Sequence, residues 1–247
     1  MVTDVGGGAL SPPVSRRERL RAATLDEIKQ TARRHLVADG PAAISLRAVA
    51  RDLGLTAAAL YRYFPSLDAL VEELCADLYL ELSEAIVTAR DAAGRAAPDD
   101  PVAPLVAACR AFRRWSVAHP AEFALMFGSP LPGVAEFDLD CAVHRAGLSF
   151  SAAFLDAFVV LWRSRPPAPA VDPPADARLI ESAGPLLAAG TELPPAALRT
   201  YLSGWTRLYG IVAMEVFGHL RWAVSDVEPL FELEIAEYIA TLGAPVG

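Results

Sequence analysis

A short segment around residue 55 carries the side chains best suited to bind another molecule. Hydroxyl and guanidinium groups donate hydrogen bonds to phosphate oxygens, and small side chains let a helix approach base edges and touch thymine methyl groups. The segment supplies both kinds, and we expect its DNA-binding residues to be Ser45, Arg47, Thr56, Ala57, Ala58, Tyr61, Arg62 and Tyr63. A second interpretation stays open, in which Tyr61 and Tyr63 are ordinary packing aromatics of an αα-hairpin.

Three predicted helices position these residues. Leu25, Ile28, Ala32 and Leu36 share one helical face, so a helix over about 17–38 is expected, ended by Gly40-Pro41. Ser45 and Thr56 are candidate N-caps for two short helices, which Gly54 and Pro65 end. The second short helix should run from Ala57 to Tyr63. Two short helices joined by a Gly-containing turn predict a helix-turn-helix unit, whose second helix enters the major groove.

Charge and composition divide the chain. Residues 1–68 hold ten basic and seven acidic side chains (+3), which leaves twelve and 23 (−11) for the remainder. Ala (47) and Leu (32) dominate the 247 residues, so an all-α fold is expected. We predict a mobile arm over 1–15, a helix-turn-helix domain over 16–65 and a ligand-binding and dimerisation domain over 66–247.

Longer helices are expected in the second domain. Leu67, Leu70, Leu74, Leu78 and Leu82 predict one from a Ser66 cap to about Ala93, and two shorter helices should follow around Leu105–Phe112 and Ala121–Phe127. A helix over 138–162 is apolar on two faces and is expected at the centre of the domain. A weaker helix should cover 175–189, and the last two should cover about 196–220 and 226–242.

The first domain resembles a known family. Ser45-Leu46-Arg47-Ala48-Val49-Ala50, Leu53-Gly54-Leu55 and Leu60-Tyr61-Arg62-Tyr63-Phe64-Pro65 are similar to the DNA-binding domain of the tetracycline-repressor (TetR/AcrR) family over about residues 20–70. The resemblance implies a homodimer with a small three-helix DNA-binding head and a larger domain that holds a small-molecule pocket. It also implies DNA contacts by Ser45, Arg47, Thr56, Tyr61 and Tyr63. Many members have a lysine where this chain has Leu67. Arg16, Arg17, Arg19 and Arg21 are candidates to replace that phosphate contact, or else they form a solvated helix end.

A weaker resemblance lies near the C-terminus. Trp205 to Gly210, followed by Glu215 to Gly218, is similar to a C-terminal class of the family with a Trp-His-Gly motif, although Tyr209 stands where that motif has His. Gly204, Gly210 and Gly218 each cost a helix about 1 kcal/mol relative to Ala, which close backbone packing would explain. A heptad-like seam in the same region predicts a two-fold interface formed by Leu202, Trp205, Tyr209, Val212, Val216 and Phe231.

Large apolar side chains from three consecutive helices are candidates to line a hydrophobic cavity, or else to fill the core. They are Trp115, Phe123, Met126, Phe127, Phe150, Phe154, Phe158 and Trp162. His119, His144 and Asp156 are the polar groups expected to orient a ligand, although His119 before Pro120 can instead cap a helix end. An apolar or amphipathic effector is therefore predicted.

Enzymatic and membrane functions find no support in the sequence. It has no Gly-rich phosphate loop, no G-x-S-x-G motif and no zinc-spaced His/Glu pair, so we expect no catalysis, no metal and no cofactor. The longest run without a charged residue spans 13 residues, Phe123 to Ala135, so no membrane span is expected. Without a signal peptide the expected location is the cytoplasm, where Cys75, Cys109 and Cys141 should be reduced, buried thiols.

These patterns together predict a sequence-specific regulator of transcription. Our main hypothesis is a homodimeric repressor that binds a near-palindromic operator and is released by its effector. The alternative is a small-molecule binding or carrier protein whose helix-turn-helix head no longer reads DNA.

Overall fold

The computed structural model describes residues 15–128, 140–164, 173–183 and 193–243. Within these residues the regular structure is helical, which confirms the expected all-α fold. The chain divides into two compact units, Met1–Leu67 and Asp68–Gly247, which we call the head and the body. Their boundary lies two residues after the predicted one.

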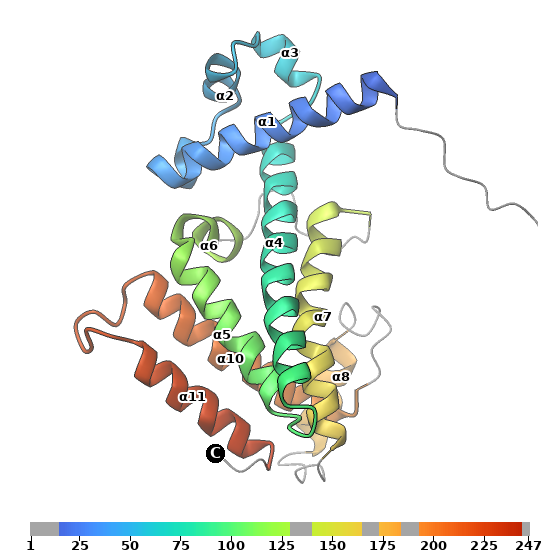
Figure 1. Ribbon diagram of the computed structural model, residues 1–247, viewed down its shortest axis with the longest axis vertical. Coiled ribbons are helices and arrows are strands. Elements are labelled where there is room, and N and C mark those ends of the chain that lie inside the picture. The colour runs from blue at the N-terminus through green and yellow to red at the C-terminus, as the bar shows by residue number, and fades with distance from the viewer. Residues whose placement is uncertain (1–14, 129–139, 165–172, 184–192, 244–247) are drawn as a thin grey trace, which may run out of the picture. The chain divides into compact units, whose positions relative to one another are not determined.

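The head is built on α1, α2 and α3 (Figure 1). Helix α1 spans Arg16–Asp39 and ends at Gly40, whose φ of 83° suits glycine, and a short 3-10 turn, η1, follows at Pro41–Ala43. Helix α2 spans Leu46–Asp52, and α3 spans Ala57–Tyr61, two residues shorter than expected. Their apolar side chains form one small core, made of Ile28, Ala32, Leu36, Ile44, Leu46, Val49, Ala50, Leu60 and Phe64.

The body begins with the longest helix. Helix α4 spans Leu67–Ala96 and continues through Gly94, where a break was expected. Helices α5 (Ala103–Ala118) and α6 (Pro120–Phe127) follow, separated only by His119. The later helices are α7 (Ala142–Arg163), α8 (Pro173–Ser182), α10 (Pro195–Val216) and α11 (Glu228–Thr241). The expected N-terminal arm up to residue 14, the start of the 138–162 helix and residues 184–189 of the weaker helix lie outside the described residues.

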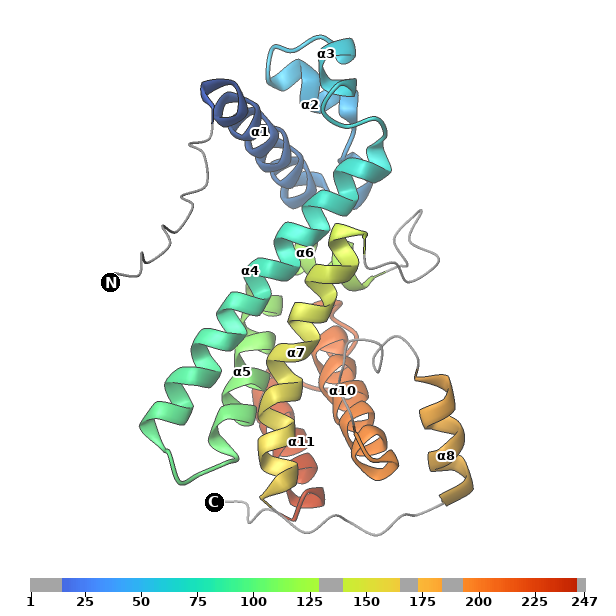
Figure 2. The same ribbon diagram turned by 90° about the vertical axis from the view of Figure 1, so that its right-hand side faces the viewer.

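Helix α10 is the central element of the body. It packs against α5, α7, α8 and α11, and Figure 2 shows α8 on its outer side. Helix α7 is less central than expected. Its face with Phe150, Phe154, Phe158 and Leu161 is buried, but the opposite face is buried only in part, at Leu155, and it is exposed at Ala152.

Aromatic rings fill the centre of the body around Phe112, which is fully buried. Its ring lies 5.7 to 6.2 Å from five others, which come from α6, α7 and α10: Phe123, Phe127, Phe150, Phe154 and Trp205. Most of the pairs are tilted or edge-on, the geometries that aromatic quadrupoles favour. This cluster joins α5, α6, α7 and α10 into one core.

Candidate DNA-binding interface and effector cavity

The turn between α2 and α3 holds the start of α3 in place. Gly54 takes a φ of 64°, and the Leu55 amide donates a hydrogen bond of 2.8 Å to the Ala50 carbonyl oxygen. The Thr56 hydroxyl accepts a hydrogen bond of 3.1 Å from the Ala59 amide, so Thr56 caps α3 as predicted. Leu60 is fully buried and anchors the other end of α3 in the head core.

Ser45 occupies the N-cap position of α2, but its side chain makes no capping hydrogen bond. The expected side-chain cap is therefore absent. The backbone at Ser45 is extended, with φ −145° and ψ 129°, and the hydroxyl is left to bind a partner outside the helix.

Most of the predicted DNA-contacting residues are accessible on the head. Thr56, Ala57 and Ala58 are exposed at the N-terminus of α3, as are Arg47 on α2 and Arg62 after α3. Tyr61 is 49% exposed, whereas Ser45 and Tyr63 are half-buried. A half-exposed tyrosine can present its hydroxyl while its ring packs, so this exposure is compatible with both interpretations of Tyr61 and Tyr63.

A hydrogen bond that sequence reasoning missed joins α1 to α2. His35 Nε2 lies 2.7 Å from Asp52 Oδ2, and the His35 side chain is only 18% exposed. The hydrogen bond from His35 lowers the pKa of the Asp52 carboxyl below its ordinary value. The two residues lie 17 positions apart in the sequence, so only the packing of α1 on α2 brings them together.

The predicted effector-binding residues separate into two groups. Phe123, Phe127 and Phe150 lie in the Phe112 cluster, and Met126 is buried beside them on α6. Trp115 stacks on His119 and donates a hydrogen bond of 2.9 Å from Nε1 to Glu81. These residues fill the core, which was the alternative for them. Trp162 stacks on Phe158, and only Phe154 and Phe158 of the eight line the cavity described next.

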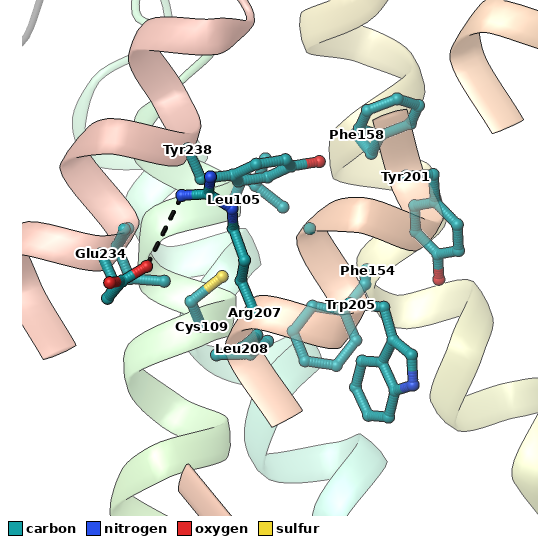
Figure 3. A pocket seen from close by; sticks show the side chains of 12 residues that line it. Leu105, Cys109, Phe154, Phe158, Tyr201, Trp205, Arg207, Leu208, Glu234 and Tyr238 are labelled. Carbon is teal, nitrogen blue, oxygen red and sulfur yellow. Dashed lines mark ion pairs between the residues drawn. The ribbon is translucent and has the colours of Figure 1, made fainter. Parts of the chain in front are cut away.

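A small cavity of about 30 Å³ lies among α5, α7, α10 and α11 (Figure 3). Its wall is aromatic and apolar, and it is formed by Leu105, Cys109, Phe154, Phe158, Tyr201, Gly204, Trp205, Leu208, Ile235 and Tyr238. Arg207 and Glu234 also line it and form an ion pair of 3.5 Å. Five of these residues come from α10, which the sequence analysis assigned to dimerisation and not to effector binding.

The thiol and the two phenol groups of the cavity wall are neutral. Burial raises the pKa of the Cys109 thiol to about 12, and it also raises the pKa of the Tyr201 and Tyr238 hydroxyls. Both hydroxyls donate hydrogen bonds of 3.2 Å to backbone carbonyl oxygens, Tyr201 to Ser151 and Tyr238 to Thr200. The only charges at the cavity, among the described residues, are those of Arg207 and Glu234.

None of the three polar residues expected to orient a ligand lines this cavity. His119 ends α5, and its Nδ1 lies 2.9 Å from the Trp115 carbonyl oxygen, so it caps a helix C-terminus. The Asp156 side chain is 70% exposed and bonds to Arg90 at 3.2 Å. His144 lies in the first turn of α7, apart from the cavity-lining residues.

The predicted dimer seam faces inward for the most part. Val212 and Phe231 are fully buried, and Trp205 packs on Phe112, Phe150 and Phe154. Tyr209 donates a hydrogen bond of 3.0 Å to the Phe127 carbonyl oxygen, while Leu202 and Val216 are half-buried. The heptad-like spacing thus arises mainly from packing within the body, because α10 is its central helix.

The prediction that all three cysteines are buried thiols is met in part. Cys75 and Cys109 are buried free thiols, but Cys141 is only half-buried. Within the described ranges no cluster of His, Cys, Asp or Glu has the arrangement of a metal site.

One helix of the described residues, α7, is long and apolar enough to cross a membrane, although no such segment was expected. Arg145 and Asp156 are charged residues within α7, but the helix as a whole is apolar. Its Phe150, Phe154 and Phe158 are buried in the body, which is typical of a core helix.

Family comparisons match both units. A model described as "Bacterial regulatory proteins, tetR family" matches residues 28–74. A second, described as "Tetracyclin repressor-like, C-terminal domain", matches residues 105–238, which is more than half of the chain. The chain belongs to the TetR family. This membership confirms the predicted family.

Individual relatives of this TetR-family chain agree. HTH-type transcriptional regulators Rv1816 of Mycobacterium tuberculosis and Mb1846 of Mycobacterium bovis are each 40% identical over 120 residues, 49% of this chain and 50% of theirs. The chain thus spans about half the length of these curated relatives.

Solved structures extend the similarity to most of the chain. The protein SCO4313 is 29% identical, with a TM-score of 0.71 over 92% of this chain and 100% of its own. A protein of unknown function from Rhodococcus sp. RHA1 is 22% identical, with a TM-score of 0.54 over 90% of this chain and 95% of its own, and it shows the fold alone.

Proposed function

We propose that this TetR-family regulator is a homodimeric repressor that binds a near-palindromic operator and leaves it when an apolar effector enters the body. The observation that carries the proposal is the exposed N-terminus of α3, capped by Thr56, with three alanines that permit close approach to base edges. The cytoplasm is the compartment in which such a protein meets its operator.

The roles within the head follow from exposure. Ala57 and Ala58 contact thymine methyl groups. Phosphates are bound by the side chains of Arg47, Arg62, Tyr61 and Tyr63 and by the Ser45 hydroxyl, which makes no capping hydrogen bond. Because α3 offers no Arg, Asn or Gln to base edges, sequence preference arises partly from DNA shape. Two heads then read two half-sites about 34–36 Å apart, one turn of B-DNA.

The effector site that we propose is the α5–α7–α10–α11 cavity. Five aromatic rings and a neutral thiol line it, so the effector is a flat, largely apolar molecule with one polar group beside Arg207 and Glu234. Pockets for small ligands measure about 300–1,000 Å³, so binding must displace wall side chains such as Trp205. A coupling free energy of about 1–3 kcal/mol between effector and DNA is sufficient for release.

An unbiased selection tests the proposed DNA binding. The purified chain is incubated with a random-sequence duplex library, and bound duplexes are recovered and sequenced over several rounds. The proposal predicts enrichment of a near-palindrome whose half-sites lie one helical turn apart. Recovery of unrelated duplexes after several rounds would favour the carrier protein with a vestigial head.

Tryptophan fluorescence tests the effector cavity with a panel of planar aromatic probes. A probe in the cavity contacts Trp205 and should quench emission in the wild type but much less in Trp205→Phe. Trp222→Phe is the matched control, because Trp222 is 87% exposed outside the cavity wall. Equal quenching in both variants would place the probe elsewhere.

A further inference from the structure

The first turns of α1 present an arginine-rich surface, for which the sequence left two roles open: a phosphate contact and a solvated helix end. We propose that Arg17 and Arg21 form a second DNA-binding surface of the head, which binds backbone phosphates next to those contacted by Tyr63. This inference rests on the proposed DNA binding. It adds a new set of contacts and enlarges the stretch of duplex that one head covers.

A capping box fixes where this helix begins. The Ser15 hydroxyl accepts a hydrogen bond of 3.2 Å from the Glu18 amide, and the Ser15 amide donates one of 2.8 Å to Glu18 Oε2. Reciprocal bonds of this kind satisfy two amides at a helix start. The arginines from Arg16 onward are therefore held on a regular helix, so each of them points in a defined direction.

Helical spacing places Arg17 and Arg21 on the face of α1 that is buried further along. With 3.6 residues per turn, positions 17, 21, 24, 28 and 32 lie in one narrow stripe. Ile28 and Ala32 of this stripe are fully buried in the head core, whereas Arg17 and Arg21 are exposed. Arg16 and Arg19 point away from the stripe, which makes the two pairs distinguishable.

Arg21 is already oriented by a residue of the proposed interface. Its guanidinium carbon lies 5.5 Å from the centre of the Tyr63 ring, within the range of a cation–π contact. A guanidinium over an aromatic face keeps its edge N–H groups free to donate to phosphate oxygens. Tyr63 thus links the α3 side of the head to the arginine stripe.

The local charge suits a polyanion. Between residues 16 and 21 there are four arginines and one carboxylate, Glu18, which is engaged with Ser15 in the capping box. From Ile28 to Arg17 the helix rises about 16 Å, at about 1.5 Å per residue, which equals the rise of about five base pairs of B-DNA. The stripe is long enough to reach phosphates beyond those contacted from α3.

The test compares two double variants of the full chain that remove the same charge from the two sides of α1. Arg17→Ala with Arg21→Ala removes the stripe, and Arg16→Ala with Arg19→Ala is the matched control. Affinity for a duplex enriched in the selection is measured by fluorescence anisotropy between 50 and 200 mM salt, and circular dichroism verifies that both variants fold.

Each lost phosphate contact makes the slope of log K against log salt less steep by about 0.9. Affinity for DNA falls between 50 and 200 mM salt. Loss of two phosphate contacts per protomer should make this fall about 12-fold smaller for each bound head. The proposal expects that loss in the Arg17/Arg21 variant and a near wild-type slope in the Arg16/Arg19 variant.

Two results would overturn the inference while leaving the proposed function intact. One is a wild-type slope in both variants, and the other is an equal reduction in both, which would show only a general effect of charge. A wild-type chain that binds no duplex in preference to random sequence contradicts the proposed function itself, and the second surface falls with it.

Discussion

Thr56 is the residue whose side chain most directly sets the start of α3. Its hydroxyl satisfies the Ala59 amide, which would otherwise lack a partner at the helix start. Thr56→Ala should therefore cost about 1 kcal/mol and accelerate amide hydrogen exchange in residues 57–64 about fivefold. Thr24→Ala is the control, because the Thr24 hydroxyl bonds only to the Leu20 carbonyl within α1. Equal exchange in the two variants would show that the cap contributes nothing.

Asp52 makes the stability of the head depend on pH in the acidic range. Its pKa is lowered in the folded chain by the hydrogen bond from His35, so its stabilisation is complete above the ordinary Asp value of 3.8. The stabilisation is lost as the pH falls through the lowered folded-state pKa. At pH 6, amides of α1 and α2 should exchange more slowly in the wild type than in Asp52→Asn, and this difference should shrink as the pH falls below 3.8.

Asp39→Asn is the control for that measurement, since it removes the same charge from the exposed C-terminal end of α1. A difference between wild type and Asp52→Asn that does not shrink as the pH is lowered below 3.8 would contradict the role of the His35–Asp52 hydrogen bond.

At the scale of the element, the glycines of α10 differ in what surrounds them. A Cβ on Gly204 would overlap the Tyr238 ring of α11, whereas nothing lies within 4 Å of a Cβ placed on Gly210. Gly204→Ala should destabilise the body by about 1–3 kcal/mol through overpacking. Gly210→Ala should stabilise it by up to about 1 kcal/mol through helix propensity. Urea unfolding of both variants measures the change in the free energy of unfolding. A change of the same sign in both variants would contradict this packing of α10 on α11.

Local signals allowed the sequence to predict the head closely. Thr56 and Gly54 set the start of α3 through a hydroxyl group and a backbone conformation, so their effects are readable one residue at a time. Pro65 lies beyond the end of α3 at Tyr61, so it did not predict that end exactly. Ser45 misled the prediction of a side-chain cap, because its residue type permits a capping bond but does not require one. The His35–Asp52 pair has no signal in sequence spacing.

The spacing of apolar residues predicted the packing of the body less well than local signals predicted the head. The stripe from Leu198 to Val216 marks a buried face, but spacing does not distinguish packing within a chain from packing between two chains. The structure assigns Val212 and Trp205 to internal packing. Likewise, the eight large apolar residues were recognisable as buried, yet only tertiary packing shows that Phe154 and Phe158 line a cavity while Phe123 fills the core.

At the scale of the whole molecule, the proposed dimer needs an exposed apolar surface. Leu233 on α11 is 62% exposed and lies among apolar neighbours from α5 and α11, including Val106 and Ala236. We expect Leu233→Glu to convert a dimer to a monomer in sedimentation at micromolar concentration. Val160→Glu, at a position 59% exposed on α7, should remain dimeric. If the Leu233→Glu variant stays dimeric, the interface lies on another surface.

The central claim is that α3 of this TetR-family chain reads a specific duplex. The most direct measurement is anisotropy competition between the enriched duplex and random duplex, for the wild type and for Ala58→Glu. Ala58 is exposed at the N-terminus of α3, so a carboxylate there leaves the head core intact but is repelled by DNA. The account predicts that the wild type prefers the enriched duplex by at least about 10³-fold. It also predicts that Ala58→Glu folds normally and loses this preference, whereas an unchanged preference in Ala58→Glu, or none in the wild type, would contradict it.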